Sequence, residues 1–149
     1  DIKVEVRRAN DADSVQFDNF DSLSLHPTLR RNVNLMNYSA PTPIQKHSIP
    51  LAMEGDDLMC CAQTGSGKTC AFLLPVVSKL LTNTEAVVPA TGPALPRCVV
   101  LAPTRELAIQ IELEAQKLCF SLPQLHPVTV YGGANSRGQL KELAFGADI

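Results

Sequence analysis

The sequence predicts an α/β fold, a parallel sheet with helices on both faces. Three short apolar runs of the kind that form buried strands occur at residues 58–61, 98–102 and 128–131. Each run is followed by a segment of helical character, and a fourth strand is expected to begin within 146–149. Strands that alternate with helices along a chain usually pair in parallel, with the crossover helices packed on the sheet.

Length and composition are those of one ordinary globular domain. The chain has 149 residues, of which 45% are hydrophobic and 19% charged. A net charge of −2 gives no bulk signal for nucleic acid, although a local binding strip is compatible with a near-neutral chain. No apolar run is long enough to span a bilayer, and no signal-peptide pattern opens the sequence, so no membrane partner is expected.

The cysteines favour an intracellular protein. They form no C-x-x-C pair and no cluster with histidine, and their number is odd. We therefore expect buried, reduced thiols rather than disulfides or zinc ligands. The expected location is cytoplasmic, with the nucleus as the alternative. The five cysteines are Cys60, Cys61, Cys70, Cys98 and Cys119.

The first half of the chain predicts an extension and then three helices. Residues 1–19 are polar and are expected to form an N-terminal extension, so that the domain proper covers 20–149. A helix is expected over 27–33, with Pro27 in its first turn. A second helix over 44–53 is expected to be interrupted by Pro50. A third, over 70–81, is apolar on nearly all sides and is expected to be kinked at Pro75.

The second half predicts a long loop and two more helices. Residues 82–96 are rich in Pro, Ala and Thr and are expected to form an exposed loop. Helices are expected from 103 to about 119 and from 136 to 145. Ligands of parallel sheets bind beyond the carboxyl ends of the strands. We therefore expect residues 62–69, 103–105 and 132–133 to share one edge of the domain.

Residues 62–69, Ala-Gln-Thr-Gly-Ser-Gly-Lys-Thr, have the pattern of a phosphate-binding loop between a strand and a helix. Gly65 and Gly67 allow the backbone N–H groups of the loop to point at phosphate oxygens, and the following helix directs its positive end to the same place. Lys68 would reach the β- and γ-phosphates, and the Thr69 hydroxyl would ligate Mg²⁺. Ala62 replaces the usual first glycine. The alternative is a glycine-rich turn without a ligand. The expected nucleotide contacts from this loop are Gln63, Thr64, Gly65, Ser66, Gly67, Lys68 and Thr69.

Four motifs in order resemble the first recombinase-A-like domain of a DEAD-box RNA helicase, of the Vasa-like branch. They are Tyr38-x-x-Pro-Thr-Pro-Ile-Gln45, the phosphate loop, Pro103-Thr-Arg-Glu-Leu-Ala108 and Gly132-Gly133. The resemblance covers the chain from about Phe20 to its last residue. The Asp-Glu-Ala-Asp motif that gives the family its name is not among the 149 residues, so we expect an incomplete domain, truncated before that motif.

The resemblance implies ATP, with ADP as product, as the nucleotide. The family's glutamine falls on Gln45, whose amide can pair with the N6 and N7 atoms of adenine but not with the corresponding edge of guanine. The family's upstream aromatic falls on Phe20, expected against the adenine face, with a core position as the alternative. Tyr38 is expected either to contact the nucleotide or to support the packing around it.

The resemblance also implies RNA as a partner. Pro103, Thr104 and Arg105 fall on the family's first RNA-backbone motif, and a helix N-terminus suits a phosphate group. The alternative is a helix cap, with Arg105 in an internal salt bridge. Gly132 and Gly133 would allow close approach of a ribose-phosphate strand, or would form an ordinary turn. Contacts with sugar and phosphate predict sequence-independent binding of single-stranded or duplex RNA.

The activity implied by the resemblance is RNA-stimulated ATP hydrolysis coupled to RNA unwinding or remodelling of RNA–protein complexes. Lys68 and Thr69 would be the catalytic residues within this chain. The second helicase domain is an expected partner, and these residues alone are expected to bind nucleotide weakly without turning it over. Two alternatives stay open: another phosphate-loop enzyme, such as a DNA helicase or a kinase, and an RNA clamp that binds ATP without unwinding.

Overall fold

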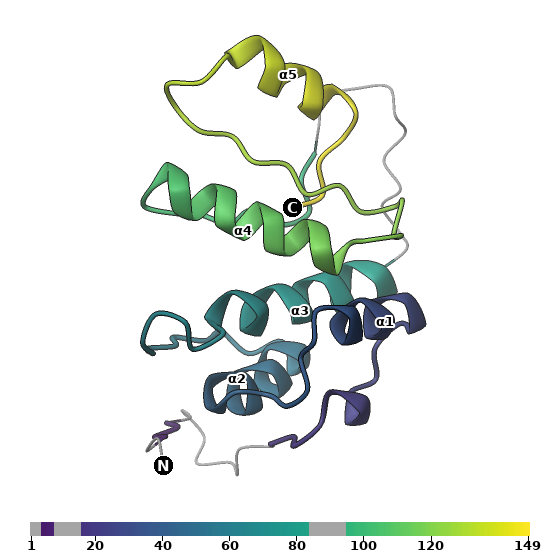
Figure 1. Cartoon of the computed structure of the whole chain (residues 1–149), viewed down its shortest axis with the longest axis vertical. Helices are drawn as coiled ribbons and strands as arrows, with labels where there is room; N and C mark the ends of the chain where they lie inside the picture. Colours follow the sequence, from purple (N-terminus) through teal and green to yellow (C-terminus); the bar gives the residue numbers. More distant parts are fainter. Residues whose placement is uncertain (1–3, 8–15, 84–94) are drawn as a thin grey trace. The chain divides into compact units, whose positions relative to one another are not determined.

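The structure, a computed structural model, describes residues 4–7, 16–83 and 95–149 (Figure 1). The chain divides into two compact units, Asp1–Lys79 and Leu80–Ile149. Most of the loop predicted at 82–96 lies outside the described residues. In chain order the helices are the short 3-10 helix η1 (Phe20–Ser22), α1 (Pro27–Leu35), α2 (Pro43–Glu54), α3 (Lys68–Thr82), α4 (Arg105–Leu118) and α5 (Ser136–Ala144).

The helices begin where their capping residues predict. Pro27 opens α1 after His26, whose Nδ1 accepts from the Thr28 N–H at 3.2 Å. The Oγ1 atom of Thr104 accepts from the Leu107 N–H at 3.2 Å at the start of α4. All five α-helices predicted from the sequence are therefore confirmed, with their ends shifted by one or two residues at most positions.

The expected interruption at Pro50 is wrong, because α2 continues from Pro43 to Glu54 with Pro50 inside it. A proline removes one N–H donor from a helix. Here the side chains of Ile49, Pro50 and Leu51 are all buried, and their burial stabilises the helix across the missing bond. Helix α3 contains Pro75, and the kink expected there stays a prediction.

The predicted parallel sheet is not confirmed, because the described residues contain no β-strand. The segments predicted as strands, 58–61, 98–102 and 128–131, are irregular. Parallel pairing requires a regular series of hydrogen bonds between neighbouring strands, and these segments lack such a series. Several of their apolar side chains are consequently exposed: Met59 is 94% and Leu101 is 91% accessible to solvent.

The second unit nevertheless pairs the beginnings of three predicted strands. The N–H groups of Arg97 and Cys98 donate to the Asp148 carbonyl oxygen at 3.0 and 2.9 Å. The Asp148 N–H donates to the His126 carbonyl oxygen at 2.9 Å, and the Val128 N–H donates to that of Ile149 at 2.9 Å. Residues 148–149 therefore join the segment that starts at 97 to the segment that starts at 126.

Side chains reinforce this junction. Arg97 forms an ion pair with Asp148 at 2.7 Å, and both side chains are largely buried. The other carboxylate oxygen of Asp148 accepts from the His126 N–H at 2.8 Å. Beyond the junction the two longer segments separate around a cavity of about 520 Å³, to which Val99, Leu101 and Val130 contribute apolar surface.

Part of the predicted N-terminal extension packs on the first unit. Phe17 is buried, and its ring meets that of Phe20 edge to face with 5.4 Å between centroids. Asp18 pairs with Lys46 on α2 at 2.7 Å. Ordered contacts in the structure therefore begin before residue 20.

The expectation that the cysteines are buried, reduced thiols is met by only some of them. All five cysteines are free; Cys70 and Cys119 are buried as expected, and Cys98 is partly exposed. Cys60 and Cys61 are exposed, contrary to expectation, because their segment is not part of a sheet. None of the described helices has the length and hydropathy needed to cross a membrane.

Candidate functional site

The phosphate loop in the first unit forms a tight turn that ends at the start of α3. Gly65 and Gly67 have positive φ angles of 77° and 90°, which other residues rarely adopt. The Ser66 N–H donates to the Gln63 carbonyl oxygen at 3.3 Å, and α3 begins at Lys68. The two glycines predicted to shape the loop therefore do so.

Lys68 lies over its own loop. Its Nζ atom donates to the carbonyl oxygens of Ala62 and Gln63, both at 2.6 Å. The Ser66 Oγ atom is buried and has no hydrogen-bond partner among the described residues. An ammonium group held only by neutral acceptors and an unpartnered hydroxyl make a donor set that fits a phosphate group.

The start of α2 is fastened to this loop by two side chains. Thr42 Oγ1 donates to the Ser66 carbonyl oxygen at 2.7 Å, and Gln45 Nε2 donates to that of Gly67 at 3.2 Å. Gln45 also accepts from the Thr42 N–H at 2.9 Å through Oε1, as in a capping box. A Cβ atom on Gly67 would lie 2.6 Å from Gln45 Nε2. Residue 67 must therefore be glycine while Gln45 holds this position.

Gln45 is buried, with 1% of its surface exposed, and both atoms of its amide have partners within the chain. An amide nitrogen carries two hydrogens and an amide oxygen two lone pairs, so each atom retains capacity for a second bond. Pairing with adenine stays a prediction. The observed bonds show Gln45 holding the phosphate loop.

Phe20 and Tyr38 lie together in the first unit. Their rings stack with 5.9 Å between centroids and 27° between planes, and Phe20 is 3% exposed. Phe20 is thus part of an aromatic cluster with Phe17 and Tyr38. The contact of Phe20 or Tyr38 with a base stays a prediction. The two rings are observed to pack against each other, as the alternative expected for each residue.

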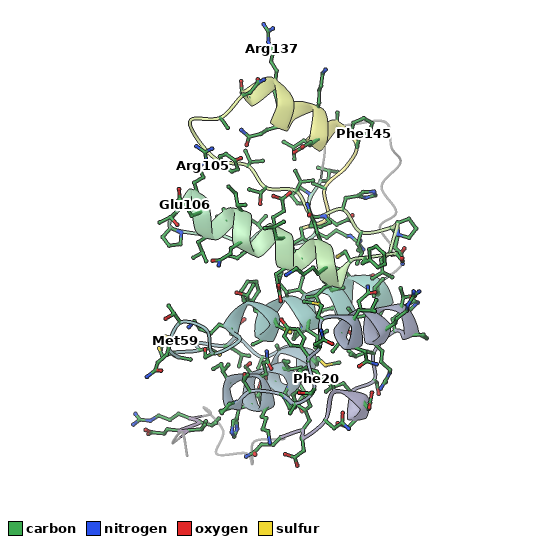
Figure 2. The ribbon with its side chains drawn as sticks, in the orientation of Figure 1. Phe20, Met59, Arg105, Glu106, Arg137 and Phe145 are labelled. Carbon is green, nitrogen blue, oxygen red and sulfur yellow. The ribbon has the colours of Figure 1, made fainter. Side chains whose placement is uncertain are left out.

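The candidate RNA residues lie in the second unit. Thr104 caps α4, which is the alternative to an RNA contact expected from the sequence. Pro103 and Arg105 are exposed beside it. Arg105 forms no ion pair within the described ranges; its guanidinium carbon lies 4.6 Å from the centroid of the Tyr131 ring instead. Figure 2 shows Arg105 at the first turn of α4, next to Glu106.

Gly132 and Gly133 follow Tyr131 directly and are exposed. Gly133 has a φ of 78°, and a Cβ at either glycine would meet no atom within 4 Å. Their surface is therefore open to a ligand. Arg105 and the glycine pair are brought together through Tyr131, whereas the phosphate loop belongs to the other unit.

Burial raises the pKa of two groups in the second unit, Glu112 within α4 and Cys119 at the C-cap of that helix. Desolvation raises the pKa of Glu112 on α4, and the nearby carboxylate of Glu142 on α5 adds to the shift. Burial, together with the charge of Asp148, raises the pKa of Cys119 to about 12. The thiol of Cys119 is therefore structural rather than reactive at neutral pH.

Four residues of these sites escaped the sequence analysis. Thr42 had a signal, since Thr-Pro-Ile-Gln is a capping-box pattern. Phe17, Tyr131 and Gln139 had none, because a single sequence does not show that Phe17 is buried against Phe20, that Tyr131 lies under Arg105, or that the Gln139 side chain hydrogen-bonds to the Tyr131 backbone.

The geometry is that of a phosphate loop with a glutamine motif attached to it. Comparison with known proteins gives the family. The profile of the DEAD/DEAH box helicase family matches residues 42–149. The chain belongs to the DEAD/DEAH box helicase family.

A curated relative and two solved structures agree with this assignment. DEAD-box ATP-dependent RNA helicase 52A of Oryza sativa subsp. japonica is 48% identical over 139 residues, which cover 89% of this chain and 23% of the relative. The RNA helicase Prp28 from Chaetomium thermophilum, solved bound to ADP, has a TM-score of 0.77 and 38% identity over 89% of this chain and 31% of its own. A DEAD box protein from Methanococcus jannaschii has a TM-score of 0.69 and 29% identity over 90% of this chain and 34% of its own. This chain therefore spans about a quarter to a third of these relatives.

Proposed function

We propose that the chain is the ATP-binding part of an ATP-dependent RNA helicase, in which RNA-stimulated hydrolysis of ATP is coupled to RNA unwinding or to remodelling of RNA–protein complexes. The observation that carries the proposal is the attachment of Gln45 to the phosphate loop through Gly67. The same glutamine can pair with adenine, so one residue would connect the base with the phosphates. The similarity to the rice ATP-dependent RNA helicase and to the RNA helicase Prp28 supports the class of reaction.

The residues of the loop have complementary tasks in this proposal. Lys68 would exchange its carbonyl acceptors for phosphate oxygens and stabilise the charge that develops during transfer to water. Ser66 would gain a partner for its hydroxyl, and Thr69 would ligate Mg²⁺. The metal would neutralise charge on the β- and γ-phosphates of the bound nucleotide.

The finer features of the fold and partners are part of the same proposal. The segments 58–61, 98–102, 128–131 and 146–149 would form the parallel sheet of a recombinase-A-like domain in the full-length protein. Arg105, Gly132 and Gly133 would contact the RNA backbone without reading its sequence. Residues 1–149 alone would not hydrolyse ATP, since they contain no Asp-Glu-Ala-Asp sequence and no second domain.

The test is ATP turnover by the full-length protein with and without single-stranded RNA. Turnover that rises with RNA, is absent with GTP and is lost in Lys68→Ala is the expected result. Tight binding of ATP and RNA without turnover would instead indicate an ATP-binding clamp. Turnover that ignores both RNA and the base would contradict the proposal.

A further inference from the structure

Arg105 is held over an aromatic ring rather than in an ion pair. Its guanidinium carbon lies 4.6 Å from the centroid of the half-buried Tyr131 ring. This contact uses no hydrogen-bond acceptor, and the Arg105 guanidinium has no hydrogen-bond or ion-pair partner among the described residues, so its N–H donors are available for the oxygens of a phosphate. The ring thereby restricts the side chain without occupying its hydrogen-bonding groups.

Tyr131 is held in turn by one side chain of α5. The Tyr131 N–H donates to Gln139 Oε1 at 2.8 Å, and Gln139 Nε2 donates to the Tyr131 carbonyl oxygen at 3.2 Å. A side-chain amide carries the same donor and acceptor as a peptide group, so Gln139 pairs with the Tyr131 backbone as a neighbouring strand would.

The start of α5 is itself fixed. Asn135 caps the helix by accepting from the Arg137 N–H at 3.0 Å through Oδ1. Arg137 points away from the rest of the second unit in Figure 2. Of the two arginines at helix starts in this unit, Arg105 is therefore the one that is oriented by other side chains.

We propose that Tyr131 and Gln139 are positioning residues for RNA binding. Gln139 fixes the backbone of Tyr131, and the Tyr131 ring holds Arg105 so that the edge of its guanidinium faces an RNA phosphate. The same bonds fix the chain immediately before Gly132 and Gly133. This inference rests on the proposed function, because it requires that Arg105 contacts RNA.

The test measures the affinity of the full-length protein for a fluorescent single-stranded oligouridine at several salt concentrations. Tyr131→Leu removes the ring and should weaken binding roughly two- to fivefold, the range of an exposed cation–π contact. Tyr131→Phe keeps the ring and should bind like the unmodified protein. Gln139→Glu replaces the amide donor by a carboxylate oxygen facing the Tyr131 carbonyl and should weaken binding similarly, whereas Gln124→Glu makes the same change at an exposed glutamine and should have little effect.

A double variant separates positioning from general structural damage. Arg105→Ala should weaken RNA binding. It should also reduce the slope of log affinity against log salt concentration by about one. If Tyr131 acts through Arg105, adding Tyr131→Leu to Arg105→Ala should cause no further loss. The proposal would be overturned if Tyr131→Leu weakened RNA binding by the same factor with Arg105 present as with Arg105→Ala. It would also be overturned if Tyr131→Leu and Gln139→Glu left RNA affinity unchanged.

Failure of the proposed function gives different results. If the unmodified protein does not bind RNA, or if Arg105→Ala binds as well as it does, the RNA role of Arg105 is wrong. Nucleotide affinity, measured with a fluorescent ADP analogue, should be equal in all variants because the phosphate loop is untouched. If Tyr131→Leu does not fold, the comparison of Gln139→Glu with Gln124→Glu, with and without Arg105→Ala, decides the question.

Discussion

The hydroxyl of Thr42 donates to the carbonyl oxygen of Ser66 at 2.7 Å across 24 residues of sequence. This bond joins the first residue before α2 to the middle of the phosphate loop. Gln45 repeats the connection one turn later at Gly67. The conformation of the loop therefore depends on side chains of another helix as well as on its own glycines.

Thr42→Val tests the contribution of that bond. Valine has nearly the shape of threonine but leaves the Ser66 carbonyl without its partner, at a cost of about 1–3 kcal/mol if water does not replace it. We expect a lower melting temperature and a several-fold weaker affinity for a fluorescent ADP analogue. Thr42→Ser retains the hydroxyl and should restore most of both. Equal affinity in the valine and serine variants would show that the bond is unimportant for the loop.

Gly67→Ala should destabilise the nucleotide-free protein more than Gly65→Ala does. Both glycines have positive φ, so alanine strains the backbone at either position by about 1–2 kcal/mol. At Gly67 the new Cβ would also lie 2.6 Å from Gln45 Nε2, whereas at Gly65 it meets nothing within 4 Å. Thermal unfolding followed by circular dichroism gives the comparison. Equal losses would mean that Gln45 moves aside without cost.

Gln45→Ala separates the predicted adenine contact of this glutamine from its observed bond to the phosphate loop. If Gln45 pairs with adenine, the variant should lose most of its preference for ATP over GTP. If Gln45 only holds the phosphate loop, affinities for both nucleotides should fall by the same factor. We expect both losses together, with the ATP affinity falling more than the GTP affinity. Competition against a fluorescent ADP analogue measures the two affinities.

Asp148→Asn should destabilise the second unit. The change removes the charge that pairs with Arg97, in a place where both side chains are about one-sixth exposed. Loss of such a largely buried pair is expected to lower the free energy of unfolding by about 2 kcal/mol, a value between those for surface and for fully buried ion pairs. Asp18→Asn breaks the exposed pair with Lys46 and should change the melting temperature much less. Equal effects would contradict the importance of the junction at 148.

Cys119 should remain unreactive at neutral pH. Burial raises its pKa to about 12, so almost no thiolate forms at pH 8, and labelling by iodoacetamide should rise only as the pH approaches that value. Because the folded pKa is above that of the unfolded chain, the stability associated with the neutral thiol is complete below about pH 8.5 and is lost as the pH rises toward 12. Peptide mapping after labelling, with Cys119→Ser as control, measures the rate. Modification of Cys119 as fast as of exposed Cys61 would contradict this assignment.

Local signals predicted the helices and the shape of the phosphate loop. Pro27 and Thr104 identify helix starts because capping depends on residues that are adjacent in sequence. Gly65 and Gly67 identify the loop because positive φ favours glycine. The resemblance to DEAD-box helicases, carried by four motifs, is confirmed by the family match over residues 42–149.

Contacts between distant residues could not be predicted. An apolar run forms a strand only when a neighbouring strand is in place to pair with it. Residues 58–61 and 98–102 have no regular pairing here, so the strands predicted from their composition are not observed. The pairing of Gln139 with Tyr131 and the burial of Phe17 depend on where the chain folds back. A single sequence contains no periodicity that reports such contacts.

The close approach of Gln45 Nε2 to Gly67 has a thermodynamic consequence. A ligand that displaces Gly67 also alters the partner of Gln45, and a ligand that engages Gln45 alters the acceptor at Gly67. Binding free energies coupled in this way are reciprocal. Any change in phosphate affinity that a bound base causes would therefore be matched by an equal change in base affinity caused by the phosphate.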